Sequence, residues 1–145
     1  MRFSTTWCAR RLALLAGGLD FCSGLGFVTS PATVLPLMGL PVPGVEALPF
    51  VRFIGAFVAA VGASYLWALC RPGARLRVVF GATVWFRLAV GIYSLAAVGM
   101  GWLAVGWLTV TVADYGLVIA QLWLLAKGAE CDSLPVAPSR QSDIP

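Results

Sequence analysis

Three charged residues, Asp20, Arg87 and Asp114, lie inside long apolar stretches of the sequence. Arg87 stands near the middle of the run VVFGATVWFRLAVGIYSLAAV, residues 78–98. An arginine at the centre of a membrane helix costs about 3 kcal/mol on insertion scales, so it normally faces the protein interior and a partner of opposite charge. Asp114, in the next apolar run, is the expected partner. The sequence therefore predicts an ion pair between Arg87 and Asp114.

Helix geometry places all three charges deep in a bilayer. At about 1.5 Å per residue, each reaches the central part of a hydrocarbon core about 30 Å thick. Arg87 and Asp114 are nearly symmetric about the glycine-rich turn at residues 99–101, so an antiparallel hairpin would bring them to the same depth. Arg52 begins its apolar run near the outer surface, where its long side chain could extend to the headgroups or inward toward Asp20.

Other polar residues share helix faces with these charges. Thr111 and Gln121 lie on the face of Asp114, and Ser94 follows Arg87 at i+7. Such a polar core could serve only to fix the register of the helices, could bind the polar group of a ligand, or could provide a path for ions or protons. The candidate residues for the core are Asp20, Arg52, Arg87, Ser94, Thr111, Asp114 and Gln121.

The composition is that of an integral membrane protein. Of 145 residues, 60% are hydrophobic and only 11% charged, with a mean hydropathy of +0.91. The net charge of +4 does not indicate nucleic-acid binding, because the basic residues flank apolar runs instead of clustering with aromatic residues. The absence of histidine excludes histidine-dependent catalysis. The four cysteines form no Cys-x-x-Cys motif, so we expect reduced thiols and neither a metal nor a cofactor.

Four apolar runs predict membrane-spanning helices at residues 12–28, 51–70, 78–98 and 103–126. The first run follows three arginines, as in a signal peptide, but Asp20 and the missing cleavage motif favour a retained helix. The second run carries small residues at four-residue spacing, which predicts close contacts with neighbouring helices. They form two rows, Gly55, Ala59 and Ala63, and Ala56, Ala60 and Ser64.

The segments between and beyond these runs complete the domain. Five prolines between residues 31 and 49 exclude a spanning helix there, and the apolar residues among them suggest a link that lies on the membrane interface, with a plain exposed loop as the alternative. We expect one domain, residues 1–127, followed by a disordered tail, residues 128–145. The predicted fold is an all-α, membrane-embedded four-helix bundle in up-down-up-down order.

The distribution of basic residues predicts the orientation of the bundle. Eight of the ten basic residues lie before the first run, between the second and third, or after the fourth. The positive-inside rule then places both termini and the middle loop in the cytoplasm. Trp7, Trp67 and Trp123 would lie at the inner interface, and Trp102 and Trp107 at the outer.

Several stretches resemble a known family. These are PATVLPLMGLPVP, then VRFIGAFVAAVGASYLWAL, then WFRLAVG around Arg87 and VADYGLVIAQLWLL around Asp114. In this order, over residues 12–126, the chain resembles the small bacterial DoxX-like four-helix membrane proteins. The resemblance implies a compact bundle in the bacterial inner membrane. The namesake of the family is associated with quinone-linked oxidoreductases, but no cofactor-binding motif is matched here, so the resemblance implies the fold and not that activity.

The leading functional hypothesis is a non-enzymatic multi-pass membrane protein. Its bundle would bind a small apolar or amphiphilic ligand, such as a quinone, a sterol-like lipid or a fatty acid, or a partner subunit or second copy, with Arg87 holding the polar end of the ligand. One alternative is a membrane-embedded isomerase that uses Asp20 and Asp114 as a carboxylate pair, which requires both to face one cavity. Another is a subunit of a transporter or of a quinone-linked oxidoreductase.

Overall fold

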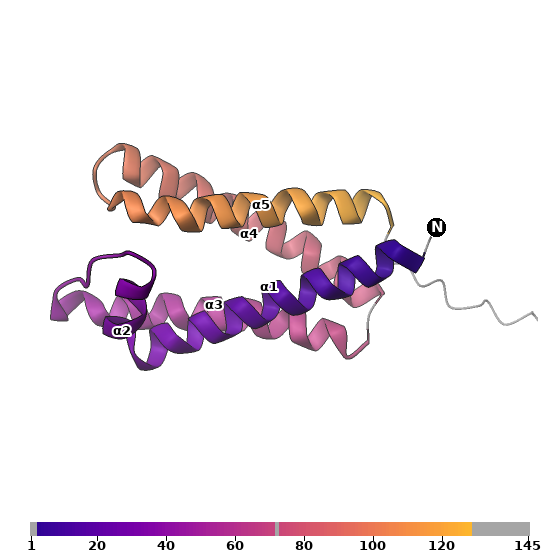
Figure 1. Cartoon of the computed structure of the whole chain (residues 1–145), viewed down its shortest axis with the longest axis horizontal. Coiled ribbons are helices and arrows are strands. Elements are labelled where there is room, and N and C mark those ends of the chain that lie inside the picture. The colour runs from indigo at the N-terminus through magenta and orange to yellow at the C-terminus, as the bar shows by residue number, and fades with distance from the viewer. Residues whose placement is uncertain (1–2, 72, 129–145) are drawn as a thin grey trace, which may run out of the picture.

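The computed structural model describes residues 3–71 and 73–128, which form an all-helical structure without strands in these ranges. With their adjoining turns, four helices are long and apolar enough to cross a membrane. The predicted all-α four-helix bundle is confirmed. Successive long helices run in opposite directions (Figure 1), and they are α1 (Phe3–Thr29), α3 (Leu48–Leu69), α4 (Ala74–Gly99) and α5 (Leu108–Ala126).

The observed helices differ from the predicted spans mainly where they begin. Helix α1 begins at Phe3, well before residue 12, and α4 begins at Ala74, before residue 78. Arg10, Arg11, Arg75 and Arg77 therefore belong to the helices and extend them beyond the apolar core. Helix α5 begins at Leu108, after the 3-10 turn η2 (Val105–Trp107), because Ala104 is extended and interrupts the helix. Of the predicted tail, residues 128–145, all but Gly128 lie outside the described residues.

Helices α1 and α3 approach each other closely through two pairs of glycines. A Cβ atom on Gly24 would lie 2.7 Å from the carbonyl oxygen of Gly55, and one on Gly62 would lie 2.6 Å from that of Gly17. No larger residue fits at either place without moving a helix. In lipid, where no hydrophobic effect drives helices together, such contacts between small residues give the dispersion energy that stabilises a helix pair.

The predicted rows of small residues coincide only partly with this contact. Gly55 and Ala59 do face α1, but Ala56, Ala60 and Ala63 are exposed on other sides of α3. The actual contact repeats every two turns, from Gly55 to Gly62, instead of every four residues. A seven-residue period keeps small residues on one side of two helices that run along each other, whereas a strict four-residue row rotates away.

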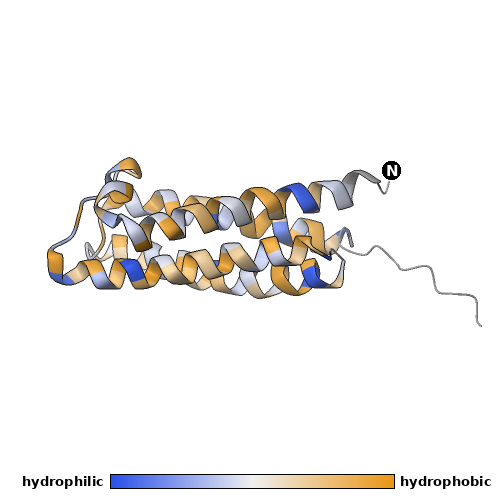
Figure 2. Cartoon of the chain, turned by 90° about the horizontal axis from the view of Figure 1, so that it is seen from below, coloured by the Kyte–Doolittle hydropathy of each residue, from blue (hydrophilic) through white to orange (hydrophobic). Residues whose placement is uncertain are grey.

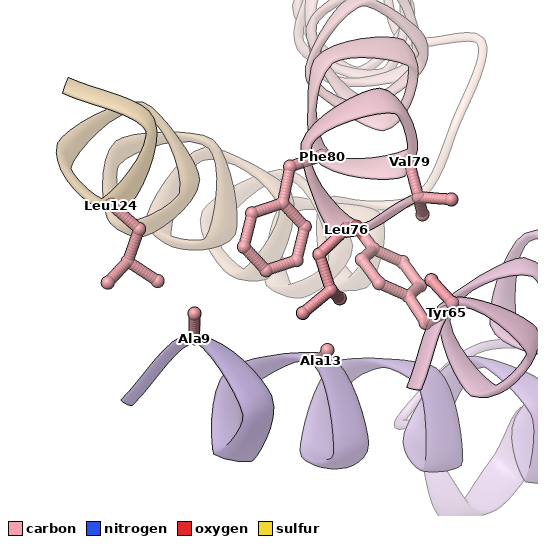
Figure 3. Packing of buried hydrophobic residues seen from close by; sticks show 8 residues of the cluster. Ala9, Ala13, Tyr65, Leu76, Val79, Phe80 and Leu124 are labelled. Carbon is pink, nitrogen blue, oxygen red and sulfur yellow. The ribbon is translucent and has the colours of Figure 1, made fainter. Parts of the chain in front are cut away.

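The pair α4 and α5 joins the first pair at the end of the bundle where the chain begins. Here an apolar cluster takes residues from all four long helices (Figure 3), namely Ala9, Ala13, Tyr65, Ala68, Leu76, Val79, Phe80 and Leu124. Outward-facing residues are also apolar, as Figure 2 shows along the helices. Leu15, Trp85 and Ile119 are each at least 70% exposed, which fits a surface in contact with lipid.

The proline-rich link folds back over the opposite end of the bundle. It contains the short helix α2 (Pro31–Leu37) and the 3-10 turn η1 (Val45–Ala47), and no spanning helix forms there, as expected. Leu35 and Leu40 are buried with Phe27, and Trp107 packs against this cluster. The link thus connects the end of the α1–α3 pair to η2, a packing that the sequence did not predict. Its position relative to the membrane surface stays a prediction.

Candidate functional site

Arg87 lies between two carboxylates in the middle of the bundle. Its Nη1 donates a hydrogen bond to Oδ1 of Asp114, and its Nη2 donates one to Oδ2 of Asp20. The expected ion pair between Arg87 and Asp114 is present, and Asp20 from α1 extends it to three residues, the ion cluster. The cluster is largely enclosed, with side chains 5% exposed for Arg87, 15% for Asp20 and 11% for Asp114.

Helical spacing places the cluster among other buried residues. On α4, Arg87 follows the buried Phe80 and Thr83 and precedes Gly91 and Ser94, all at steps of three or four residues. On α5, a second buried face carries Thr111, Asp114, Val118, Gln121 and Leu124. The buried faces of α4 and α5 thus carry polar side chains among apolar ones, while large apolar side chains such as Trp85 and Ile119 also cover the outside, as a lipid environment requires.

Arg52 does not join the cluster. It is exposed in the first turns of α3, and Asp20 forms its ion pair with Arg87. The helix register explains why. Because Gly17 of α1 lies against Gly62 of α3 and Gly24 against Gly55, Asp20 lies level with the residues near Ala59. Arg52 is about two helical turns away from that level.

A second polar network lies next to the ion cluster. Tyr65 of α3 donates to the hydroxyl oxygen of Thr83 on α4 at 2.7 Å, and Nε2 of Gln121 on α5 donates to the hydroxyl oxygen of Tyr65. The Arg87 guanidinium lies 6.0 Å from the centroid of the Tyr65 ring. Gln121 was a predicted core residue, whereas Tyr65 and Thr83 were not. The position of Thr83 could have indicated this network, because Thr83 lies one turn before Arg87 on the same face of α4.

Three buried polar atoms have no hydrogen-bond partner among the described residues. They are Nε of Arg87, Oγ1 of Thr111 and Oε1 of Gln121. Ser94 is also buried, on the same face of α4 as Arg87. Buried polar groups are nearly always paired in native proteins, so each such atom calls for an explanation. Of the seven candidate core residues, Arg87, Ser94, Thr111, Asp114 and Gln121 are buried and Asp20 is largely enclosed, and the three unpartnered atoms leave capacity for further hydrogen bonds.

The arrangement restricts the chemistry that the carboxylates can do. The guanidinium of Arg87 occupies the space between Asp20 and Asp114, so the two carboxylates face one cation instead of one cavity. An isomerase using them as an acid–base pair would need that space for substrate. The charge of Arg87 is already balanced by two carboxylates, so an anionic headgroup at the guanidinium would add a second excess negative charge to a largely enclosed site. Within the described ranges, no group of three or more potential metal ligands occurs.

An open groove lies between α3 and α4, beside the ion cluster. Its volume is about 400 Å³, and it is lined by Phe57, Ala60, Val61, Ser64, Ala82, Thr83 and Phe86. Ala60, Ser64 and Ala82 are small, so the two helices leave a hollow between the flanking rings of Phe57 and Phe86. Ser64 donates to the carbonyl of Val61 at 2.7 Å and Thr83 to that of Val79 at 2.7 Å. Both hydroxyl protons are thus used within the helices, and the groove is lined mainly by hydrocarbon.

Comparisons with known proteins add no relative to this geometry. No family model matches the chain, and neither the curated proteins nor the solved structures give a match. The resemblance to DoxX-like proteins stays a prediction from the stretches quoted above.

Proposed function

We propose that this chain is a non-enzymatic, multi-pass protein of the bacterial inner membrane that binds an apolar or amphiphilic molecule in the groove between α3 and α4. The groove carries the proposal. It is an open hollow of about 400 Å³ with an almost wholly apolar lining, which suits a hydrocarbon chain that lies along the helices. It opens on the outward flank of helices whose exposed side chains are apolar, so a ligand can enter it from the hydrocarbon region without crossing water.

The ion cluster supports the groove from inside the bundle. Arg87 is one turn after Thr83, a groove residue, and its bonds to Asp20 and Asp114 tie α4 to α1 and α5. A ligand held directly by Arg87, as the sequence suggested, is less favourable, because the guanidinium is only 5% exposed and its charge is already balanced by two carboxylates. The cluster positions the helix that forms one wall of the groove, and the apolar wall residues hold the ligand.

The charges favour the predicted orientation. Described basic residues gather at the end of the bundle where α1 begins, α3 ends and α5 ends (Figure 1). They are Arg10, Arg11, Arg71, Arg75, Arg77 and Lys127. By the positive-inside rule this end faces the cytoplasm, and with it both termini. The resemblance to DoxX-like proteins agrees with the inner membrane as location.

Filling the groove tests the proposal. Ala60→Phe places a ring in the hollow, and Ala113→Phe makes the same change at an exposed position of α5 as the control. After gentle extraction, mass spectrometry of the parent protein should find an apolar molecule bound in a fixed ratio. The Ala60→Phe variant should lose it, and the control should keep it. Retention in Ala60→Phe equal to the parent, or repeated preparations of the parent with no bound molecule, would show the proposal to be wrong.

A further inference from the structure

Arg75 and Trp67 continue the line of the groove toward the basic end of the bundle. Trp67 follows Ala60 by about two turns of α3, and Arg75 precedes Ala82 by about two turns of α4, so each lies on nearly the same helix face as a groove residue. The guanidinium carbon of Arg75 lies 4.3 Å from the centroid of the Trp67 ring. This contact shows that both side chains occupy the flank that α3 and α4 share.

The length of this flank matches one leaflet of a bilayer. From Arg75 to Phe86, at the far end of the groove, α4 rises about 16 Å at 1.5 Å per residue. Half of a hydrocarbon core about 30 Å thick is about 15 Å. A lipid with its headgroup at Arg75 would therefore have its acyl chain beside the groove over the depth of its own leaflet.

The charge at this end suits an anionic headgroup. Arg71 is exposed in the connection between α3 and α4, and Lys127 is exposed after α5. The carboxylates of the described residues lie elsewhere, Glu46 in η1 at the opposite end and the other two in the ion cluster. A guanidinium stacked on an indole keeps its N–H edge available, and that edge matches the geometry of a phosphate. Trp67, 54% exposed, is the residue type that anchors at the headgroup level.

We infer that the groove takes an acyl chain of an anionic phospholipid whose phosphate binds at Arg75 against Trp67. The inference rests on the proposed function, because the same groove holds the chain, and it adds the class of ligand. An anionic lipid is selected over a zwitterionic one because a zwitterionic headgroup brings a cationic group to an end that is already positive.

Native mass spectrometry of the purified full-length protein tests the inference. Phosphatidylglycerol and phosphatidylcholine with identical acyl chains are added at equal concentration. The parent should prefer the anionic lipid by about fivefold or more, since one arginine near the membrane surface contributes about 1 kcal/mol. Arg75→Gln should lose most of the preference yet still bind both lipids, and Arg75→Lys, which keeps the charge, should retain most of it. Arg52→Gln, an exposed arginine at the other end of α3, is the control and should behave as the parent.

The outcomes separate this inference from the proposed function. Equal binding of the two lipids by the parent, or an unchanged preference in Arg75→Gln, overturns the anionic headgroup while the groove can still bind apolar molecules. Loss of both lipids in Ala60→Phe supports the groove as the place of the acyl chain. If the parent binds neither lipid, the proposed function fails together with the inference.

Discussion

Removing Arg87 should destabilise the bundle more than removing either of its carboxylate partners. Arg87→Met leaves both Asp20 and Asp114 without their cation, a defect that costs about 3 to 5 kcal/mol where ion pairs are buried. Asp20→Asn or Asp114→Asn instead leaves Arg87 bonded to the remaining carboxylate. Each should cost about 1.5 to 3 kcal/mol, the usual contribution of one hydrogen bond to a charged group. A simple pair of Arg87 and Asp114 would predict equal losses from either side.

Combined variants make the distinction sharper. Arg87→Met with Asp114→Leu abolishes both ion pairs and leaves the Asp20 carboxylate without its cation, so it should stay well below the parent in stability. Adding Asp20→Leu removes the last buried charge, and this triple variant should recover much of the loss because all three positions are then apolar. Thermal unfolding in detergent, followed by tryptophan fluorescence, measures the order, with Arg52→Met as the control at an exposed arginine. Full recovery in the double variant would refute the three-residue cluster.

Two further predictions concern packing and orientation. Gly62→Ala should destabilise the protein by about 1 to 3 kcal/mol, because the added methyl group would lie 2.6 Å from a backbone carbonyl oxygen of α1. The control Gly81→Ala has open space around the added methyl group and should be neutral or slightly stabilising in the same unfolding measurement. Reporter fusions after Leu40 and after Met100 should report a position outside the cytoplasm, and a fusion after Arg75 should report a cytoplasmic position. A cytoplasmic result at Met100 would contradict the model of four membrane-spanning helices.

The helices and the ion pair between Arg87 and Asp114 could be predicted from the sequence, because both depend on distances along the chain. Apolar length defines a possible span, and counting residues from a turn gives the depth of each charge. Arg87 and Asp114 lie on consecutive helices joined by a short turn, so equal depth was enough to bring them together. Gln121 was included for the same reason, because it shares a helix face with Asp114.

The contact between Asp20 and Arg87 could not be predicted in the same way. The two residues come from helices that are not consecutive, so their meeting depends on how α1 and α4 are arranged and rotated in the bundle. That arrangement follows from the glycine contact of α1 with α3 and from the apolar cluster at the basic end. The sequence did not indicate the polar role of Tyr65, because its ring belongs to the apolar cluster and only its hydroxyl group contacts Thr83.

The small residues of α3 show why a sequence pattern alone leaves the function open. Gly55 and Gly62 on one face bring α1 so close that their backbones touch, whereas Ala60 and Ser64 on another face leave a hollow against α4. In lipid, a missing side chain can be compensated by a neighbouring helix or by a hydrocarbon chain, since both offer dispersion contacts of similar strength. Whether a helix or a hydrocarbon chain contacts a given face of α3 depends on the position at which the partner helix is held. Here the ion cluster and the polar network around Tyr65 fix the position of α4, and the groove between α3 and α4 stays open toward the lipid.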